Sequence, residues 1–275
     1  MDIPKNYEGE YVFKDTKERE LKLSFLPPYE GKYDKAPLYF LIPGGGWHME
    51  VRADMIDFSK ESVEEMRRDG CAVVAIDYRV CGEGVAMQEI IEDCFDALKY
   101  IAHYADDLKV DSSRIITSGH SAGGHLALML AFAPKEMFKS DYEFDDDFEI
   151  CGCVAFSPPT ILHEPGFYNL SNINEVFEGC FTKEELERTS PVTYVNENCP
   201  PTFLAAGTSD YLVYSLSSEK LYDKLCEAGV KAELVLSVGG GHMYEKINKT
   251  ITPDLSREDV QYKSVEFMKN TILGG

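Results

Sequence analysis

The chain has 275 residues, 44% of them hydrophobic, which suits one globular α/β domain with a deep core. Its 48 aspartates and glutamates outnumber its 27 lysines and arginines, and the formal net charge of −21 opposes binding to nucleic acid or to an anionic membrane. The N-terminus lacks the features of a secretion signal, and no apolar run approaches the roughly 18 residues of a membrane span. We therefore expect a cytoplasmic protein with a single domain over residues 1–275, without a nucleic-acid or membrane partner.

Strand and helix patterns alternate along the chain after an extended N-terminal region. Residues 11–13 and 20–26 are rich in β-prone side chains and predict an antiparallel hairpin that ends at Pro27. Beyond it, we expect strands over residues 38–42, 72–76, 114–118, 151–156, 202–206 and 233–238 and helices over residues 55–69, 88–104, 124–132 and 215–228. This order predicts an α/β fold, with a doubly wound, mostly parallel sheet that begins with the antiparallel hairpin.

Two stretches interrupt this alternation. Residues 141–149 carry six carboxylates and no basic residue, a composition that favours a solvated loop over a metal site. Residues 158–201 form a longer insertion, in which Thr182 and Glu185 predict the capping box of a short helix through Arg188. Because the insertion follows a strand, we expect it to lie over the C-terminal edge of the sheet as a cap on the functional site.

Eight cysteines lie far apart in the sequence and show no paired spacing typical of zinc sites. Most of them fall in apolar runs, so we expect buried, reduced thiols. Cys151 and Cys153 occupy one strand, and the alternation of side chains predicts that both point to the same face of the sheet. The sequence thus predicts no metal ion and no organic cofactor, and it leaves open whether the chain forms a homo-oligomer.

A Gly-His-Ser-Ala-Gly pentapeptide at residues 119–123 marks Ser121 as a candidate nucleophile. It lies between a β-prone run and an apolar run of good helix formers, as a tight strand-to-helix turn requires. Such a turn strains the backbone of the serine, lifts its hydroxyl above the sheet and aims the first N–H groups of the helix at a negative charge beside it. The glycines and the alanine of the pentapeptide supply the small side chains that the turn needs.

A serine hydroxyl is too weakly acidic to attack a carbonyl unaided, so the site requires a general base and a carboxylate that orients it. His242 follows the last predicted strand and a run of three glycines that allows the chain to turn over the sheet edge. Asp210 directly follows the preceding strand, and its alternative role is to cap the helix that starts near residue 215. The order serine, aspartate, histidine is that of the α/β-hydrolase triad, which predicts Ser121, Asp210 and His242 as catalytic residues.

The five remaining histidines have simpler interpretations. His120 is the variable residue of the pentapeptide, His125 is expected to face outward from the first turn of its helix, and His103 suits the C-terminal end of a helix dipole. His48, beside a glycine turn, and His163, in the cap-like insertion, are candidates for contact with a substrate, although a solvated loop histidine is the more common case.

Attack on a carbonyl places negative charge on its oxygen, and fixed N–H donors at that point stabilise the charge. The sequence Pro-Gly-Gly-Gly-Trp at residues 43–47 follows the first buried strand, and its glycines permit the irregular dihedrals that turn successive N–H groups inward. We expect the N–H groups of Gly45, Gly46 and Ala122 to form an oxyanion hole, and Trp47 is a further candidate for substrate contact. A flexible loop and a dinucleotide-binding loop are the alternatives, but the tract lacks the Gly-x-Gly-x-x-Gly pattern of the latter.

From about residue 38 to the C-terminus, the chain resembles the hormone-sensitive-lipase-like and acetyl(xylan)-esterase-like serine esterases of the α/β-hydrolase superfamily. The motifs that carry this resemblance are Pro-Gly-Gly-Gly-Trp (43–47), Asp-Tyr-Arg (77–79), Gly-His-Ser-Ala-Gly-Gly (119–124), Ser-Pro-Val (190–192), Gly-Thr-Ser-Asp (207–210) and Gly-His (241–242). Together they are highly specific for the family, whose triad matches Ser121, Asp210 and His242. One position departs from the family pattern, because a histidine that supports the glycine turn is often found where this chain has Pro43.

The resemblance implies hydrolysis of short-chain acyl esters, with acetyl as the first candidate, through an acyl-enzyme. Esters of sugars or xylo-oligosaccharides are among the substrates that it suggests, and the partner is then a small molecule. Two alternatives stay open. The glycine-tryptophan pattern also occurs in kynurenine formamidases, which keeps an amide hydrolase or an acyl-peptidase under consideration. The other alternative is a non-catalytic binding member of the fold, which the intact triad disfavours.

Overall fold

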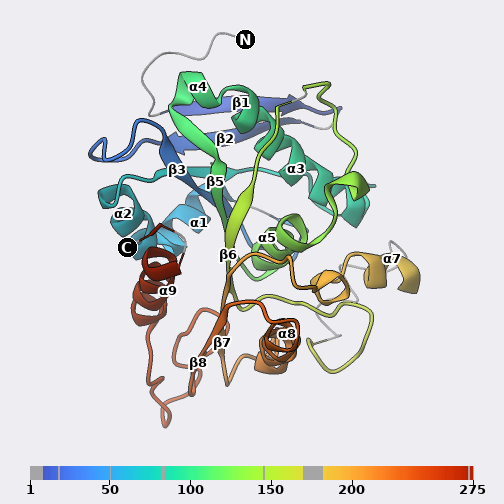
Figure 1. The fold of residues 1–275 in the computed structure, drawn as a ribbon. Helices are drawn as coiled ribbons and strands as arrows, with labels where there is room; N and C mark the ends of the chain where they lie inside the picture. Colours follow the sequence, from blue (N-terminus) through green and yellow to red (C-terminus); the bar gives the residue numbers. More distant parts are fainter. Residues whose placement is uncertain are drawn as a thin grey trace.

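The computed structural model describes residues 9–17, 19–49, 51–81, 84–144, 146–169, 182–271 and 273–274. Within these residues, eight strands form one sheet in the order β1-β2-β4-β3-β5-β6-β7-β8 (Figure 1). Their bounds are β1 (Gly9–Asp15), β2 (Glu20–Leu26), β3 (Ala36–Ile42), β4 (Ala72–Ile76), β5 (Val110–His120), β6 (Ile150–Phe156), β7 (Thr202–Gly207) and β8 (Ala232–Ser237). The hairpin β1–β2 and the pair β2–β4 are antiparallel, and the other pairs are parallel. The predicted α/β fold, mostly parallel with an N-terminal hairpin, is therefore confirmed.

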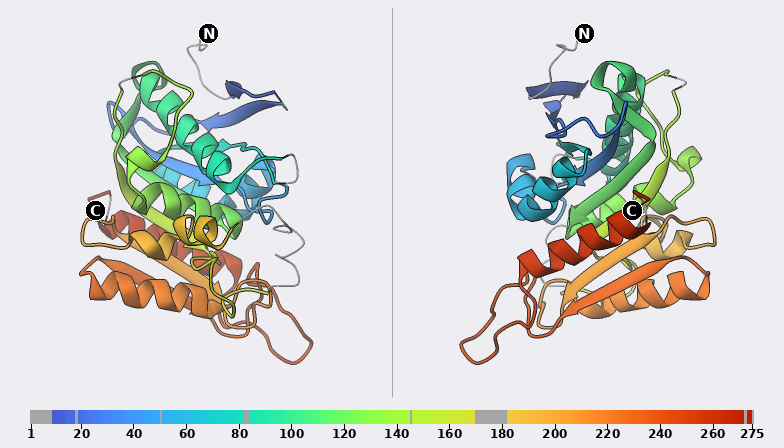
Figure 2. Two further views of the ribbon diagram at one scale, coloured as in Figure 1. Left: turned by 90° about the vertical axis from the view of Figure 1, so that its right-hand side faces the viewer. Right: turned by 60° about the vertical axis from the view of Figure 1, so that its left-hand side comes forward.

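Helices cover both faces of the sheet (Figures 1 and 2). One face carries α3 (Met87–His103), α5 (Ala122–Phe132) and α8 (Ser215–Glu227), and the other carries α1 (Arg52–Phe58), α2 (Lys60–Arg68) and α9 (Arg257–Thr271). The shorter elements are α4 (Ala105–Leu108), α7 (Lys183–Arg188) and the 3-10 turns η1 (Lys135–Met137) and η2 (Pro191–Tyr194). Among the described residues, no helix is long and apolar enough to cross a membrane.

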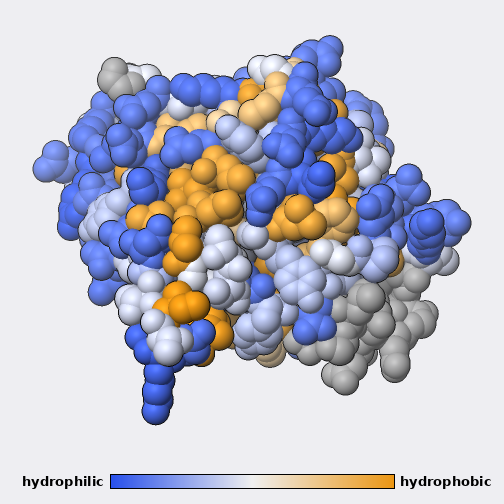
Figure 3. Space-filling view, turned by 90° about the horizontal axis from the view of Figure 1, so that it is seen from below, coloured by the Kyte–Doolittle hydropathy of each residue, from blue (hydrophilic) through white to orange (hydrophobic). Residues whose placement is uncertain are grey.

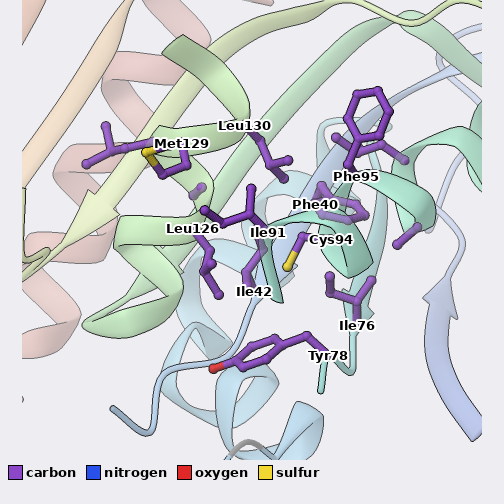
Figure 4. Close-up of a cluster of buried hydrophobic side chains, with 14 of the residues drawn as sticks. Phe40, Ile42, Ile76, Tyr78, Ile91, Cys94, Phe95, Leu126, Met129 and Leu130 are labelled. Carbon is purple, nitrogen blue, oxygen red and sulfur yellow. The ribbon is translucent and has the colours of Figure 1, made fainter. Parts of the chain in front are cut away.

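Strands β3 and β4 are mostly apolar along their whole length because both of their faces are covered. Every residue of β3 and of β4 is buried. Phe40 and Ile42 of β3 point into the cluster formed with α3 and α5, where they meet Ile91 and Leu126 (Figure 4), whereas Tyr39 lies in the cluster under α1, α2 and α9. Each fully buried side chain of this size contributes about 1.5–3 kcal/mol, so packing on both faces stabilises these strands in the middle of the fold.

A break divides the single helix that the sequence predicts over residues 55–69. The chain forms α1 and α2 instead, separated at Ser59, whose φ of −94° and ψ of 18° depart from helical values. The fully buried side chain of Gln261 in α9 compensates for the break, since its amide donates to the carbonyl of Phe58 and its oxygen accepts the N–H of Ser62 at 3.1 Å. Backbone groups at a helix end need such partners, and here a distant part of the chain supplies them.

Two predictions for the cysteines are wrong. The pairing of β5 with β6 runs from Ile115–Ile150 to Ile116–Gly152, which leaves Cys151 as an extra residue in a bulge. A bulge shifts the alternation of side chains, so Cys151 packs with the cluster under α1, α2 and α9, and Cys153 lies in the cluster under α3 and α5. The two thiols therefore point to opposite faces. Cys226, near the end of α8, is exposed rather than buried; all described cysteines are free thiols.

The acidic stretch over residues 141–149 forms a loop, as predicted, because its described part contains neither helix nor strand. A buried lysine ties the loop to the body of the protein. Nζ of Lys14 in β1 lies 2.9 Å from a carboxylate oxygen of Asp141, and 2.8 and 2.6 Å from those of Asp93 and Asp96 in α3, which are fully buried. Loop, hairpin and helix are thus joined by one cluster of charges.

The insertion after β6 is described over residues 158–169 and 182–201, and its predicted remainder lies outside the described residues. Its helix α7 has the predicted capping box, since the hydroxyl of Thr182 accepts the N–H of Glu185 and the Glu185 carboxylate accepts the N–H of Thr182. The described parts pack beside α8, where the N–H of Thr160 donates to Oγ of Ser217 at 2.8 Å. The role of the whole insertion as a cap stays a prediction.

Candidate active site

Ser121 lies in the tight turn between β5 and α5. Its φ of 56° and ψ of −123° are strained for a residue with a side chain, as the nucleophile turn of an α/β-hydrolase requires. Larger neighbours would not fit, because a Cβ on Gly119 would lie 2.2 Å from the backbone of Gly123. The N–H of Ser121 donates to the carbonyl of Phe156 at 2.8 Å, which fixes the turn against the end of β6.

Asp210 and His242 meet at the same edge of the sheet. Nδ1 of His242 donates to Oδ2 of Asp210 at 2.6 Å, which makes Nε2 the basic nitrogen of the ring. The carboxylate of Asp210 is fully buried, and its Oδ1 accepts the N–H groups of Leu212 at 2.8 Å and Val213 at 3.0 Å. The alternative role of Asp210 as a helix cap is not found, since α8 begins after Tyr214 without a side-chain cap.

The backbone of His242 is held by two side chains from neighbouring strand ends. Nε2 of His120 donates to the His242 carbonyl at 2.9 Å, and Oγ of Ser157 donates to the same oxygen at 3.2 Å. The buried ring of His120 lies between the rings of His242 and Phe58, with centroid distances of 4.7 and 4.4 Å. Burial, assisted by repulsion from His242, lowers the pKa of His120 to about 3, so the ring stays neutral at pH 7. Apart from the position of His120 next to the serine, no sequence pattern predicts this contact.

A tight turn follows β3 and forms another wall of the site. Gly45 has a φ of 113°, and a Cβ there would lie 1.9 Å from the carbonyl oxygen of Met49, so only glycine fits. The hydroxyl of Tyr78 lies 2.9 Å from the carbonyl oxygen of Pro43 and 3.2 Å from that of Gly44. Figure 4 shows Tyr78 at the edge of the core cluster. This tyrosine, rather than a histidine at position 43, holds the start of the turn.

Trp47 and His125 are buried behind this turn. Nε1 of Trp47 donates to Nδ1 of His125 at 3.2 Å, and Nε2 of His125 donates to the carbonyl of Thr189 at 2.6 Å. The prediction that His125 faces outward is wrong: α5 is enclosed, and the insertion supplies the acceptor for this ring. Burial lowers the pKa of His125 to about 4.

One pocket brings these elements together, with a cavity volume of about 470 Å³. Its wall includes Ser121, His242 and the turn after β3, with Trp47 as a buried part of that turn. The remaining wall is largely apolar and is formed by Met49, Val51, Met55, Phe58, Pro159, Leu212, Val213 and Met243, with His48, Asp54 and His120 as polar members. Figure 3 shows the molecule from this edge of the sheet, where hydrophobic residues gather on the surface.

The other predicted site residues separate into two groups. Gly45 and Gly46 line the pocket, and among the described residues no acceptor is found for their N–H groups. His48 lines the pocket too, with Nδ1 3.2 Å from the carbonyl oxygen of Gly46. His163 does not line the described wall, and Nδ1 of its ring lies 3.1 Å from Oγ of Ser190. The structure thus brings His48, but not His163, to the site.

The sheet order and the strained serine turn are those of the α/β-hydrolase superfamily. Its BD-FAE family model matches residues 25–225, which is more than half of the chain. The chain therefore belongs to the BD-FAE family, and the membership of the α/β-hydrolase superfamily expected from the motifs is confirmed.

Solved structures have the same fold. Esterase Est2 of the planctomycete Thermogutta terrifontis, bound to propionate, is 24% identical, with a TM-score of 0.78 over 98% of this chain and 95% of that chain. The same esterase phosphorylated by paraoxon is also 24% identical, with a TM-score of 0.78 over 99% of this chain and 96% of that chain. At this level of identity, the likeness supports the fold.

Curated relatives match most of this chain but are longer. The isoprenylcysteine alpha-carbonyl methylesterase ICME of Arabidopsis thaliana is 26% identical over 75% of this chain and 50% of its own length. The non-reducing polyketide synthase ausA of Aspergillus calidoustus is 25% identical over 78% of this chain and 12% of its own length. The chain thus spans about half of the methylesterase and a small part of the synthase.

Proposed function

We propose that the chain is a serine carboxylesterase in which Ser121 is the nucleophile, His242 the general base and Asp210 the residue that orients the base. The observation that carries the proposal is the 2.6 Å hydrogen bond between His242 and Asp210 at a pocket whose wall includes the strained Ser121 turn. The three side chains follow three different strands of one sheet, at the edge where sites form in open α/β sheets.

The reaction has two halves. Nε2 of His242 takes the hydroxyl proton of Ser121 while Oγ attacks the ester carbonyl; when the tetrahedral intermediate collapses, the same proton goes to the departing alcohol and the acyl group remains on Ser121. Water then attacks the acyl-enzyme with His242 as base, and the acid leaves. Asp210 remains ionised throughout and stabilises the imidazolium that forms in both halves.

The N–H groups of Gly45, Gly46 and Ala122 form the oxyanion hole in this proposal. Two features support it: the pocket position of the two glycines, and the place of Ala122 as the first residue of α5, where N–H groups have no acceptor within the helix. Loss of one such donor typically costs about 3–4 kcal/mol of transition-state stabilisation. Tyr78 acts indirectly, since its hydroxyl holds the carbonyls at the start of the glycine turn.

Short-chain acyl esters are the substrates that the pocket supports best. A cavity of about 470 Å³ with a largely apolar wall suits a short acyl chain, and the propionate bound to the Thermogutta esterase is consistent with this. Acetyl is the first chain length to test. Sugar and xylo-oligosaccharide esters are the less supported part of the proposal, because sugar hydroxyls would meet few polar side chains in the described wall.

The first experiment compares p-nitrophenyl acetate, butyrate and octanoate with acetylated xylo-oligosaccharide and N-formylkynurenine. We expect the highest kcat/KM for acetate or butyrate. Ser121→Ala should abolish turnover, and Asp210→Asn should lower kcat by about 10⁴-fold, as loss of the orienting carboxylate does in serine proteases. Ser113→Ala and Asp254→Asn serve as controls, because these two side chains lie outside the pocket.

Covalent labelling identifies the nucleophile independently of substrate choice. Paraoxon should add one diethylphosphoryl group to the wild type, located on Ser121 by peptide mass spectrometry, and none to Ser121→Ala. Full ester hydrolysis by Ser121→Ala would overturn the site assignment. Rapid turnover of formylkynurenine with negligible ester turnover would instead favour the amide hydrolase.

A further inference from the structure

Asp54 is the one side chain with a full charge at pH 7 in the described wall of the pocket. The other wall residues are apolar, glycine, serine or histidine. Asp54 lies in the first turn of α1 and is exposed, at the rim between the buried Met55 and the exposed Val51 of the same wall. A carboxylate in an otherwise apolar wall is the group with which a substrate of opposite charge would interact.

The carboxylate of Asp54 has no hydrogen-bond or ion-pair partner among the described residues, although a cation is close in sequence. Arg52, two residues before it, is occupied: its guanidinium binds Oδ1 of Asp77 at 2.5 Å, Oε1 of Glu10 at 3.0 Å and Oγ of Ser24 at 2.8 Å. Asp54 therefore keeps its charge available to the pocket.

The rest of the molecule reinforces this local charge. With a net charge of −21, the chain attracts cations and repels anions at long range. Among the residues that the structure describes, the pocket wall offers no lysine or arginine to an anionic group of a substrate. Both features disfavour esters that carry a carboxylate or a phosphate. Neutral and cationic esters remain as candidate substrates.

We propose that Asp54 selects substrates whose acid or alcohol part carries a positive charge, so that the natural substrate is a short ester of a cationic compound. This inference rests on the proposed esterase function and adds the class of substrate. Asp54 binds the cation and takes no part in the proton transfers of His242. Two unit charges about 6 Å apart, in an effective dielectric constant of about 40, change affinity by about tenfold.

The test uses pairs of esters with the same shape and different charge. Butyrylcholine and 3,3-dimethylbutyl butyrate differ in the alcohol part, by a quaternary nitrogen in place of a quaternary carbon. Methyl 6-aminohexanoate and methyl heptanoate differ in the acid part, by an ammonium group in place of a methyl group. For at least one pair, we expect the wild type to favour the cationic ester by about tenfold in kcat/KM at low salt, with the difference mainly in KM.

Asp54→Asn should reduce this preference by about tenfold, and Asp57→Asn is the matched control. Asp57 lies one helical turn further along α1 and is exposed, as Asp54 is, but it does not line the pocket. Asp57→Asn therefore has the same net charge as Asp54→Asn and leaves the pocket wall unchanged. The preference should survive in Asp57→Asn. It should also weaken in the wild type at 0.5 M salt, which shortens the range of charge interactions to about 4–5 Å.

Three results would overturn the inference. The first is equal kcat/KM within both pairs for the wild type, with the neutral esters hydrolysed; the esterase proposal would then stand and the role of Asp54 would fall. The second is an equal loss of preference in Asp54→Asn and Asp57→Asn, which would assign the selection to net charge. The third is hydrolysis of p-nitrophenyl butyrate by the wild type with none of the four esters hydrolysed, which would leave the esterase function in place and remove this inference; if no ester at all is hydrolysed, both fail.

Discussion

Replacement of His120 tests whether the residue before the nucleophile positions the catalytic base. Its Nε2 donates to the backbone carbonyl of His242 at 2.9 Å, and its ring is buried against Phe58. His120→Gln keeps an N–H donor at nearly the same distance from the backbone, whereas His120→Met fills a similar volume without a donor. The two variants therefore separate the hydrogen bond from the packing.

The expected effect on stability is modest and the effect on turnover is large. The lost hydrogen bond contributes about 0.5–1.5 kcal/mol, and Ser157 still donates to the same carbonyl at 3.2 Å, so no acceptor is left without a partner. A displacement of about 1 Å in a catalytic group can lower a rate by about 100-fold. We expect His120→Met to lower kcat by about 10- to 100-fold at unchanged KM, and His120→Gln to stay close to the wild type.

The assay is steady-state hydrolysis of p-nitrophenyl butyrate by both variants, with thermal unfolding measured in parallel. Because burial keeps His120 neutral at pH 7, the comparison at that pH separates its hydrogen bond from any effect of its charge. Equal kcat in the two variants would refute the positioning role. A loss of kcat that follows only the fraction of unfolded protein would assign His120 to packing.

Three further predictions concern the supports of the site and of the fold. Lys14→Met leaves the buried carboxylates of α3 without their cation. Burial opposes the charge of this lysine, but Asp93 and its neighbours outweigh burial and raise the pKa of Lys14 above its ordinary value. We expect a loss of about 3–5 kcal/mol in the free energy of unfolding, measured in urea, at unchanged kcat. The exposed ion pair between Lys35 and Asp106 is the control. A similar loss in the free energy of unfolding of Lys35→Met would contradict the reasoning. Tyr78→Phe should lower kcat about tenfold while the free energy of unfolding falls by about 0.5–1.5 kcal/mol, and unchanged kcat would remove Tyr78 from the support of the glycine turn. Below its ordinary pKa of 6.5, His125 is neutral in the folded protein but protonated in the unfolded chain. The free energy of unfolding should therefore fall as the pH drops from 6.5 towards 4. In His125→Gln the slope of the free energy of unfolding against pH should decrease by about 1.4 kcal/mol per pH unit, and an unchanged slope would contradict the assignment.

Much of the candidate site could be predicted from the sequence because each of its parts depends on a few neighbouring residues. A nucleophile turn needs small residues around one serine, and a strand followed by glycines delivers a backbone turn at the sheet edge. For this reason Ser121, Asp210 and His242 could be singled out without knowledge of the contacts between them. The 2.6 Å bond between Asp210 and His242 depends only on two loops that leave adjacent strands β7 and β8.

Other features could not be predicted because a distant residue decides them. The break at Ser59 depends on Gln261, and the buried position of His125 depends on the carbonyl of Thr189. The opposite faces of Cys151 and Cys153 depend on a bulge in the register with β5, which the alternation within one strand does not reveal.

Local patterns in the sequence predict the order of the strands and of the helices α3, α5 and α8, the small residues of the serine turn and the positions of the three polar residues at strand ends. These follow from the period of apolar residues and from the backbone freedom of glycine, which act over a few neighbouring residues. The division into α1 and α2 and the helix α9 were not predicted. The tertiary structure decided which side chains hold these residues in place. His120 contacts the backbone of His242, Tyr78 contacts the glycine turn, and Asp54 lines the pocket. These placements result from packing between separate elements, which only the folded sheet brings together.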